Sequence, residues 1–582
     1  MKKWMIFCMV LLLLTAFAGC ANRETPHMGE QQPVDMAAEA EIRRAIGLML
    51  DREYIARQIA QSGQIPASTF VPKGMTDADG SQFYENTAYY DPSEAAYESN
   101  FSQAVESLKK YYAYDEETGQ FLNFPALTYL YNNSDAHKAV GEYLQNVLSG
   151  VGITLYLENQ EWNTFLNTRK QGNYMLARNG WVADYNDPIC FLDMWTTQSG
   201  NNDIGYGTGA HAAAKLYSLD LTPYGLDIQV TEGTWAQTYD VLIDAIKRNT
   251  DAEKRYEMMH LAEDMLMETG CITPLYYYTD LYMLHSSVEG FYANMLGYKF
   301  FHQTTVNGSG SGISVCLASE PDNLDPALTS TVDGATLISH LFSGLAKWSE
   351  DEEGKLTVVA DCAESLPEGV LQEDGTVVYT YTLREDVKWS DGKPVTAYDF
   401  VYAWSRAASD ATGAGHGYLF RVIDGYSTGE LAVTATDART LSVTLTNPIG
   451  YWNELLALPT YFPVREDVVS GNEGWAADPK TYVSNGAYTM SGWEHNSVIT
   501  LQKNDNFHDA EQVTMENIRF FLSDDANNML SNFKNGTWLV IDQVPTNEIA
   551  ALKEQYPEEL VIADQLGTYY LCWNINKPLT AK

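Results

Sequence analysis

The sequence predicts an α/β protein built from two or three domains. Its 582 residues and 65.0 kDa exceed what one hydrophobic core ordinarily organises. A strand pattern in LTYLYNN, an amphipathic helix pattern over residues 135–148 and a second strand pattern in GITLYLENQ follow one another. This β-α-β alternation is typical of a mixed α/β lobe. Hydrophobic residues make up 45% of the chain and aromatic residues 12%, which favours a folded globular protein.

The remaining elements follow in chain order. From Ile42, apolar residues recur at helical spacing in IRRAIGLMLDREYIARQI, and IPASTFVPKGM predicts a Pro-punctuated loop. Asp91-Pro92-Ser93 predicts the start of another helix, with Asp or Ser as its cap. We expect a further helix over residues 251–270 and then a strand in CITPLYYYTDLYML. Residues 307–312 have the composition of a flexible Gly/Ser linker, and GTVVYTYTLREDVKWSDGKPVTAYDFVYAW predicts a strand, a turn and a helix.

Residues 1–20 have the pattern of a lipoprotein signal peptide. Two lysines precede an apolar run from Trp4 to Leu14, which is too short for a membrane-spanning helix. Ala18-Gly19-Cys20 resembles a lipobox, with Phe17 where such sites usually carry Leu. We therefore expect acylated Cys20 to hold the protein on the outer face of the cytoplasmic membrane, at the cell surface or in the periplasm. The polar residues 21–41 would form a tether.

Composition excludes several classes of function. The net charge of −41 weighs against a nucleic-acid partner, because phosphate binding needs a basic face. The seven cysteines show no CxxC spacing and no disulfide framework, and the odd number leaves at least one unpaired. The ten histidines show no HExxH or similar spacing. We therefore expect no metal site and no cofactor.

One stretch, residues 157–188, concentrates side chains suited to a zwitterionic ligand. It holds Trp162, Arg169, Arg178, Trp181 and Asp184. A guanidinium group grips both oxygens of a carboxylate, a carboxylate suits an ammonium group, and indole rings offer broad apolar area. A free peptide carries both kinds of charged end. The alternative is an ordinary helix-to-strand segment with surface arginines, core tryptophans and a turn at Asn-Asp-Pro.

These residues carry a resemblance to a known family. LENQEWNTFLNTR and ARNGWVADYNDP resemble the ligand-binding region of bacterial periplasmic oligopeptide-binding proteins, which belong to the oligopeptide/dipeptide/nickel solute-binding family of ABC importers. ISVCLASEPDNLDPAL resembles the start of the mature protein in that family, and SNGAYTMSGW and LGTYYLCWNINKPL resemble later segments. The resemblance implies a bilobal periplasmic-binding-protein-like fold with an extra third domain, whose two lobes are joined by a two-crossover hinge.

The order of the two halves departs from the family. The block resembling the family's first half lies second here, so the chain resembles a circular permutant, whether natural, engineered or a gene-model artefact. The expected divisions are residues 1–20 as signal peptide, 21–41 as tether, 42–275 as lobe II, 276–306 as the return to lobe I, 307–312 as linker, 313–342 as the start of lobe I, 343–475 as the extra domain, and 476–582 as the rest of lobe I and a crossover.

The resemblance also assigns roles to residues. Asp184 matches the residue that binds a peptide's α-ammonium group, and His137, Arg169 and Arg178 match positions that meet the terminal carboxylate. We expect His137 to act best when protonated. The expected side-chain pockets use Trp162, Trp181, Tyr278, His416 and Tyr418, and the expected backbone contacts lie at Thr331 and Val332. His416 and Tyr418 stand where the family often has one Tyr, so part of the specificity is expected to differ. Each residue also has a structural alternative, such as a helix cap, a core aromatic or a surface histidine.

We therefore expect a substrate-binding lipoprotein of an ABC peptide importer. It would capture short peptides between two lobes and deliver them to a membrane permease, as a monomer and without enzymatic chemistry. Alternative ligands are a nickel chelate, haem or a cell-wall peptide. A secreted hydrolase using clustered acids and aromatics such as Trp181, Asp184 and Asp187 is a further alternative, as are a rearranged product uncoupled from its transporter and a domain-swapped dimer.

Overall fold

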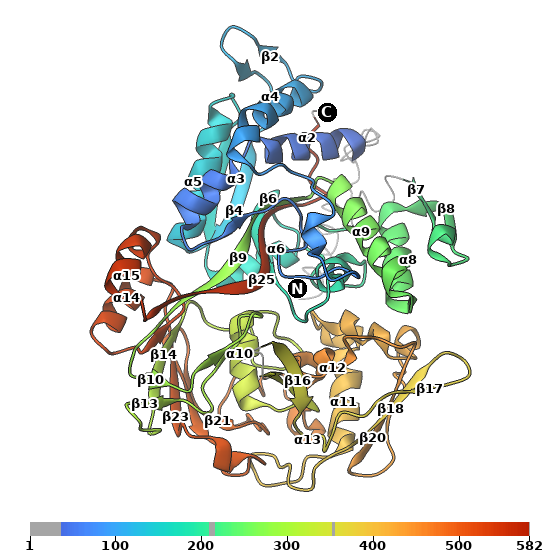
Figure 1. Ribbon diagram of the computed structural model, residues 1–582, viewed down its shortest axis with the longest axis vertical. Helices are drawn as coiled ribbons and strands as arrows, with labels where there is room; N and C mark the ends of the chain where they lie inside the picture. Colours follow the sequence, from blue (N-terminus) through green and yellow to red (C-terminus); the bar gives the residue numbers. More distant parts are fainter. Residues whose placement is uncertain (1–35, 209–215, 352–354, 581–582) are drawn as a thin grey trace, which may run out of the picture.

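Two lobes and a third domain are organised around one long sheet (Figure 1). The computed structural model describes residues 36–208, 216–351 and 355–580, so the expected signal peptide, Cys20 and most of the expected tether lie outside the described residues. The strands of the sheet run in the order β21-β22-β23-β14-β24-β9-β25-β6-β4-β5, and β1 (Ile65–Pro66) pairs with β9. We call residues 36–277 and 566–580 lobe II, residues 279–342 and 484–564 lobe I, and residues 343–483 the third domain.

Two strands pass from one lobe into the other and form the hinge. They are β9 (Ile272–Leu284) and β25 (Leu560–Trp573), which pair antiparallel. The N-terminal half of β9 pairs with the C-terminal half of β25 inside lobe II, and the remaining halves pair inside lobe I. The register shifts between Asp564 and Thr568, and such irregularities bend and twist a strand. The expected two-crossover connection is confirmed.

Lobe II contains the predicted β-α-β unit. Its elements are β4 (Leu127–Asn132), α5 (Asp135–Ser149), β5 (Leu155–Gln160), α6 (Trp162–Lys170) and β6 (Leu176–Val182). β4 pairs parallel with β5 and with β6, and β6 pairs antiparallel with β25. α5 buries Val140, Leu144 and Leu148, whose fourfold spacing puts them on one helix face. β6 thereby carries its residues from the centre of the lobe to the edge that faces lobe I.

Further helices cover lobe II. They include α2 (Met36–Leu48), α4 (Tyr97–Leu108), α8 (Trp235–Arg248) and α9 (Ala252–Glu268). α2 begins inside the segment expected to be a tether. Buried Glu39 of α2 accepts hydrogen bonds from the backbone N–H groups of Leu579 and Thr580, at 2.7 to 2.9 Å. The segment after β25 is therefore docked against the first described helix.

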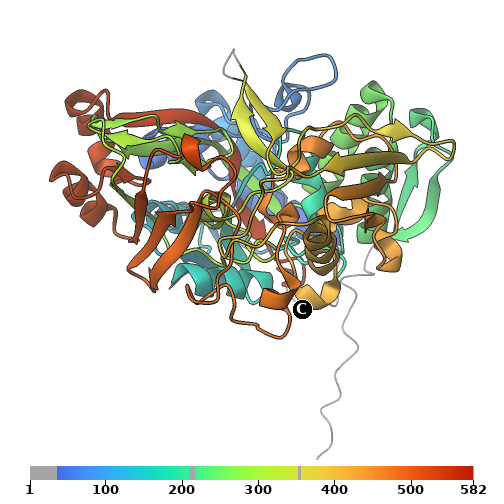
Figure 2. The same cartoon turned by 90° about the horizontal axis from the view of Figure 1, so that it is seen from below.

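Lobe I and the third domain lie below lobe II in Figure 1, and the view from below in Figure 2 shows them side by side. Lobe I contains β14 (Ile313–Leu317), β21 (Tyr488–Glu494), β22 (Val498–Lys503), β23 (Asn517–Leu522) and β24 (Val540–Ile541), with α10 (Val332–Leu341), α14 (Ala526–Lys534) and α15 (Ile549–Gln555). The third domain has an antiparallel sheet in the order β17 (Val370–Leu371), β18 (Val377–Thr382), β20 (Thr440–Leu445) and β19 (Val433–Ala435). The helix α11 (Ala397–Ala407) packs against this sheet. The expected third domain is thus present beside lobe I.

The expected flexible linker at residues 307–312 is instead an ordered turn. Asn307 and Gly308 have φ values of 50° and 75°, and the Val306 N–H donates to the Ser309 carbonyl at 2.8 Å. The Glu516 N–H donates to the Gly310 carbonyl at 2.6 Å, and a Cβ on Gly310 would lie 2.1 Å from the Thr514 carbonyl oxygen. Composition alone missed this, because the partners lie two hundred residues further along the chain.

Candidate functional site

A cleft opens between the lobes beside the hinge. Its central cavity, of about 270 Å3, is walled by β6, α6, the hinge strands, the start of α10 and the third domain. Nine residues expected to contact the ligand line it: Trp162, Arg169, Arg178, Trp181, Asp184, Tyr278, Thr331, Val332 and His416. Two adjoining cavities, of about 910 and 270 Å3, share Arg178 with it and include His137. We call these three connected spaces the interlobe cleft.

Asp184 follows the end of β6 and faces the third domain. The side chain of His416 faces it, with its Nε2 3.5 Å from the Asp184 Oδ2. Burial opposes a charge on His416, but the Asp184 carboxylate outweighs it and raises the pKa of the imidazole. The Trp181 ring lies 6.0 Å from the His416 ring. On the other side, the Asp184 N–H donates to Cys190 Sγ at 3.1 Å, and burial keeps the pKa of that thiol well above its ordinary value.

Arg178 is a buried cation with no carboxylate partner among the described residues. Its side chain is 7% exposed, and its Nε donates to Asn132 Oδ1 at 2.8 Å. The guanidinium lies 5.3 to 5.9 Å from the ring centroids of Phe165, Trp162 and Tyr569. Within the described ranges no carboxylate forms an ion pair with it. A buried unpaired charge is costly, so this position favours an anionic ligand group.

His137 stands in the first turn of α5, beside Arg178. Its Nδ1 lies 3.3 Å from the Tyr569 hydroxyl, and the two rings stack at 5.6 Å. Burial, and then the charge of Arg178, lower its pKa well below the ordinary value. The imidazole is therefore neutral near pH 7, which is not the protonated form that would hold a carboxylate best. A neutral ring still donates one hydrogen bond.

Arg169 reaches the cleft but already has a partner. Its Nε lies 2.8 Å from Asp203 Oδ2, and Asp203 also accepts from Asn179 Nδ2 at 3.1 Å. Although burial works against its charge, Asp203 keeps the pKa of Arg169 raised. Its charge is balanced inside the protein, so a ligand carboxylate gains less from Arg169 than from Arg178.

The aromatic residues form the broad walls. Trp162 opens α6 and lies against Arg178 and Phe165, and Trp181 lies on β6 with an Nε1–H that finds no acceptor among the described residues. Tyr278 crosses from β9, and a Cβ on Gly180 would lie 2.1 Å from its hydroxyl. The absence of a side chain at Gly180 therefore makes room for the Tyr278 phenol, whose pKa burial raises to about 12.

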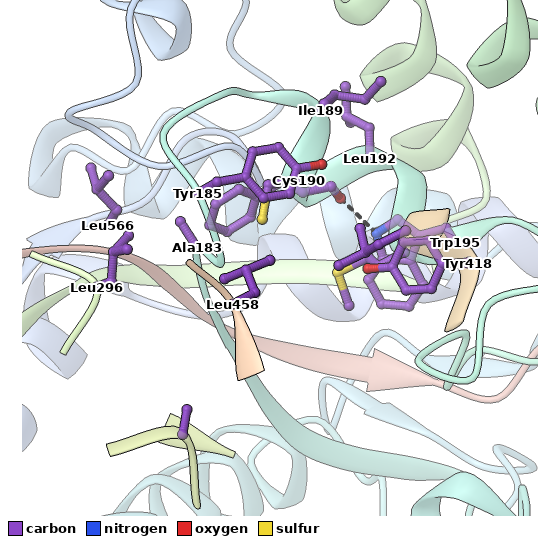
Figure 3. Packing of buried hydrophobic residues seen from close by; sticks show 14 of the residues in the cluster. Ala183, Tyr185, Ile189, Cys190, Leu192, Trp195, Leu296, Tyr418, Leu458 and Leu566 are labelled. Carbon is purple, nitrogen blue, oxygen red and sulfur yellow. Dashed lines mark hydrogen bonds between the residues drawn. The ribbon is translucent and has the colours of Figure 1, made fainter. Parts of the chain in front are cut away.

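Tyr418 lies in the core and does not line the cleft. It is 2% exposed, and its ring lies beside Trp195 in the packed cluster that also holds Tyr185, Cys190 and Leu458 (Figure 3). This corrects the expectation that Tyr418 forms a side-chain pocket. The structure separates it from its near neighbour His416, because the short helix of residues 417–422 turns the Tyr418 side chain inward.

At Thr331 and Val332, the backbone presents a hydrogen-bond donor rather than an acceptor to a ligand. Thr331 caps α10: its hydroxyl accepts from the Gly334 N–H at 3.2 Å, and its carbonyl accepts from the Ala335 N–H at 2.9 Å. The Val332 N–H stands at the first helical position, where the helix supplies no acceptor. A ligand carbonyl is the natural partner for this group.

Several contacts join the two sides of the cleft. Lys170 Nζ donates to Ser330 Oγ at 2.9 Å, and Asn201 Nδ2 donates to the Gly415 carbonyl at 3.3 Å. The Arg421 guanidinium pairs with Asp244 at 2.7 Å. The lobes are thus in contact around the cleft, as in a closed arrangement.

The sequence did not single out several lining residues. They are Lys170, Asn201, Asp203, Leu296, Tyr298, Ser330, Asp333, Leu458, Pro459, Thr460 and Gln565, together with small and apolar neighbours of the predicted residues. Lys170, Ser330 and Asp333 are sequence neighbours of predicted site residues, and this proximity could have identified them. Leu296, Thr460 and Gln565 come from distant elements and carried no signal in the sequence.

Comparison with known proteins places these residues in a family. The model of bacterial extracellular solute-binding proteins, family 5, matches residues 22–203 and 357–582. The dipeptide-binding protein DppE of Bacillus subtilis is 32% identical over 270 residues, which cover 44% of this chain and 47% of the relative. The probable deoxycholate-binding periplasmic protein YgiS of Escherichia coli is 32% identical over 274 residues, covering 45% and 49%.

Among solved structures, OppA of Burkholderia pseudomallei is 30% identical, and the match covers 42% of this chain and 48% of that chain with a TM-score of 0.38. The chain spans about half the length of the curated relatives it matches. In the described residues no helix is long and apolar enough to cross a membrane.

Proposed function

Because the chain belongs to the bacterial extracellular solute-binding proteins of family 5, we propose that it captures short peptides in the interlobe cleft and delivers them to the permease of an ABC importer. One observation carries the proposal: Arg178 on β6, which has no carboxylate partner among the described residues, and the carboxylate of Asp184 just after β6 line one cleft. Arg178 would hold the peptide carboxylate and Asp184 the ammonium group. The relatives named dipeptide- and oligopeptide-binding proteins support this assignment.

The spacing of the two charges limits the peptide that spans them. Arg178 and Asp184 are six positions apart, so their backbones are separated by at most about 20 Å at roughly 3.3 Å per residue. An extended tri- to pentapeptide fits within that span. Longer peptides would extend into the adjoining cavity of about 910 Å3, beside His137. Neutral His137 would then donate a hydrogen bond to the terminal carboxylate.

The rest of the peptide would be held without strong side-chain selection. The Val332 N–H would donate to a peptide carbonyl, and Trp162, Trp181 and Tyr278 would line roomy side-chain pockets. His416 would modulate the ammonium site through Asp184. Lobe closure about β9 and β25 would bury the ligand and present one closed surface to the permease. No chemical step is needed for this role.

We propose further that acylated Cys20 anchors the mature protein to the outer face of the membrane. The lipobox-like segment at residues 18–20 supports this, and the polar residues that follow would act as a spacer between the membrane and the folded lobes. Radiolabelled palmitate incorporation that is lost in Cys20→Ala tests the anchor. Incorporation that persists in Cys20→Ala would contradict it.

We also propose that the two halves of the family fold are exchanged along this chain. The docking of Leu579 and Thr580 onto Glu39 supports it, because the family order would continue from one directly into the other. The tight turn at Asn307 and Gly308 supports it as the join between the family's usual ends. The alignments with relatives, each over about half of both chains, agree with one half matching at a time.

A second ligand class has one observation in its favour. YgiS is named as a probable deoxycholate-binding protein, and a bile acid offers a carboxylate but no ammonium group. Such a ligand would use Arg178 and the aromatic walls and would be indifferent to Asp184. The two classes are therefore separable by mutation.

Calorimetric titration with tripeptides tests the proposal. Asp184→Asn and Arg178→Gln should each weaken a tripeptide with free ends by roughly 10- to 100-fold, the value of a charge-assisted hydrogen bond. Exposed Asp227→Asn and Arg248→Gln are matched controls and should leave binding unchanged. Equal peptide binding by all four variants contradicts the proposed contacts. Deoxycholate binding that depends on Arg178 but not on Asp184 would favour the second ligand class.

A further inference from the structure

A second cavity lies outside the interlobe cleft, between lobe I and the third domain. Its volume is about 360 Å3. Its ring-bearing walls are Tyr292, Phe300, His302, Phe342, Trp348, Phe462 and Phe507, and its charged walls are Lys347, Glu350, Asp361 and Asp509. A cavity of a few hundred Å3 with aromatic walls and a few polar groups, at a domain boundary, is the usual form of a small-molecule site.

This cavity backs onto the peptide cleft through shared elements. The start of α10 lines the cleft at Thr331, and its C-terminal part lines the second cavity at Ser339. The short segment after Leu458 does the same, with Thr460 facing the cleft and Phe462 facing the second cavity. One layer of structure therefore separates the two spaces, and they share no lining residue.

The walls favour an aromatic guest. Tyr292 of β11 (Tyr292–Ala293) and Phe300 of β12 (Lys299–Phe300) stack at 5.3 Å between ring centroids. His302 stacks on His340 at 4.8 Å. Burial lowers the pKa of both histidines, that of His340 to about 4, so these rings are neutral near pH 7. A planar ring offers the area and the offset geometry that such walls accept.

One wall residue carries a hydrogen-bond donor without an acceptor. Trp348 on β15 (Ala346–Glu350) is 8% exposed, and its Nε1–H has no partner among the described residues. An unsatisfied buried donor destabilises the folded protein. An oxygen atom on a ligand would supply the missing acceptor.

The charges around the cavity favour a cation over an anion. Lys347 Nζ lies 3.3 Å from Asp361 and 3.4 Å from Asp509, and Arg384 also pairs with Asp509 at 3.1 Å. Glu350 adds another carboxylate to the walls. Burial opposes ionisation of Asp361, yet a hydrogen bond from His508 and the charge of Lys347 hold its pKa at about 2.

The balance of these charges is negative. Asp386 pairs with the Arg384 guanidinium at 2.9 Å, so Asp361, Asp509 and Asp386 contact the two cations Lys347 and Arg384, and Glu350 lines the cavity as a fourth carboxylate. Asp361, His508 and Asp509 lie close enough together to hold a cation, and the Lys347 ammonium now contacts both carboxylates. A second ammonium group would reduce the surplus, and a ligand carboxylate would increase it.

We propose that the second cavity binds a small aromatic amine that carries a hydroxyl or carbonyl oxygen. The ring lies among the aromatic walls, the oxygen accepts from Trp348 Nε1, and the ammonium group lies toward Asp509 and Glu350. This site is independent of the peptide cleft. A phenolic amine of about ten heavy atoms, such as tyramine, has the required groups and a size suited to the cavity.

Calorimetry on the full protein with tyramine and two analogues tests the site. Phenethylamine lacks the oxygen, and 3-(4-hydroxyphenyl)propionate replaces the amine with a carboxylate. Tyramine should bind about tenfold more tightly than phenethylamine, and the propionate should not bind. Trp348→Phe should keep the wall but erase the advantage of tyramine over phenethylamine. Thermal unfolding confirms that each variant is folded.

Trp181→Phe, in the peptide cleft, is the matched control and should leave tyramine binding unchanged. Asp509→Asn provides a second arm and should weaken tyramine several-fold. Tyramine that fails to bind, binds no better than the propionate, or responds to Trp181→Phe rather than Trp348→Phe overturns the proposal. Trp348→Phe should leave tripeptide binding intact, which separates this site from the proposed function.

Discussion

His416 is an internal competitor for the acid that would hold a peptide ammonium group. Its Nε2 lies 3.5 Å from Asp184 Oδ2 at the wall of the cleft. His416→Gln keeps the size and hydrogen-bonding capacity of the side chain but removes its charge. In acid, where His416 is protonated, this variant should bind peptides more tightly than the wild type.

The size of the effect follows from the geometry. At 3.5 Å and an effective dielectric constant of about 20, the attraction between the two charges is about 5 kcal/mol. Burial of the imidazolium offsets most of this, and the pKa of His416 remains raised. An arriving ammonium group must share Asp184 with a charged neighbour. We expect a net penalty of about 1.5 kcal/mol, or about tenfold in affinity, the lower end of what a hydrogen bond to a charged group contributes.

The sign of the pH dependence follows by linkage. Ammonium binding at Asp184 lowers the pKa of His416, so peptide uptake releases a proton, and wild-type affinity rises as pH rises through the raised pKa. Lys170 opposes the charge on His416, and the Thr329 backbone supports it. In the peptide-free protein the pair stabilises the fold below the unfolded histidine pKa of about 6.5, and this stability is lost as pH rises through the folded value.

The assay is calorimetry of a tripeptide between about pH 5 and about pH 7, where histidine titrates but the peptide amine stays charged. Asp333 also lines the cleft, and burial raises its pKa to about 6, so Asp333→Asn is run in parallel. His416→Gln should bind about tenfold more tightly than wild type at the acid end, and this advantage should shrink as the pH rises through the raised pKa of His416. A His416→Gln protein that keeps the full wild-type slope would refute the competition.

Three further predictions concern stability and chain order. Burial raises the pKa of Glu263 to about 8, so the stability of the wild type falls as pH rises from about 4.5 to about 8. In urea unfolding, Glu263→Gln should lack this loss and gain about 2 to 4 kcal/mol over wild type across that pH range. Parallel pH curves for the two proteins would contradict this prediction. Gly310→Ala should lower the free energy of unfolding by more than about 2 kcal/mol, because its Cβ would meet the Thr514 carbonyl oxygen. Gly308→Ala has open space around it and should lower the free energy of unfolding by only about 1 kcal/mol, because of its positive φ. Equal losses would mean that the turn is not packed as described. A rearranged chain can be made in which residues 313–580 come first and a short linker joins them to residues 36–306. This chain should have the same melting temperature and peptide affinity as the original one. A misfolded product would contradict the exchanged order.

Local patterns predicted the lobe architecture well. The LTYLYNN, 135–148 and GITLYLENQ segments form the expected β4, α5 and β5, because their apolar spacing is satisfied by one buried face. The concentration of charge and indole in residues 157–188 likewise identified a segment that lines the cleft. The resemblance added His416 and Thr331, which lie far away in the chain.

Details that depend on distant partners escaped prediction. The neutralisation of Arg169 needs Asp203, which reaches it only in the folded lobe. The low pKa of His137 needs burial beside Arg178, and the inward turn of Tyr418 needs the packing around Trp195. Such properties are set by tertiary packing, which composition and periodicity do not encode.

Blocking the two ends of a peptide tests the central claim most directly. A tripeptide with free ends is titrated into the protein beside its N-acetylated, its C-amidated and its doubly blocked forms. We expect the free tripeptide to bind, each single block to weaken it by roughly 10- to 100-fold, and the double block to abolish measurable binding. Equal affinity for the free and doubly blocked peptides would contradict recognition through Asp184 and Arg178.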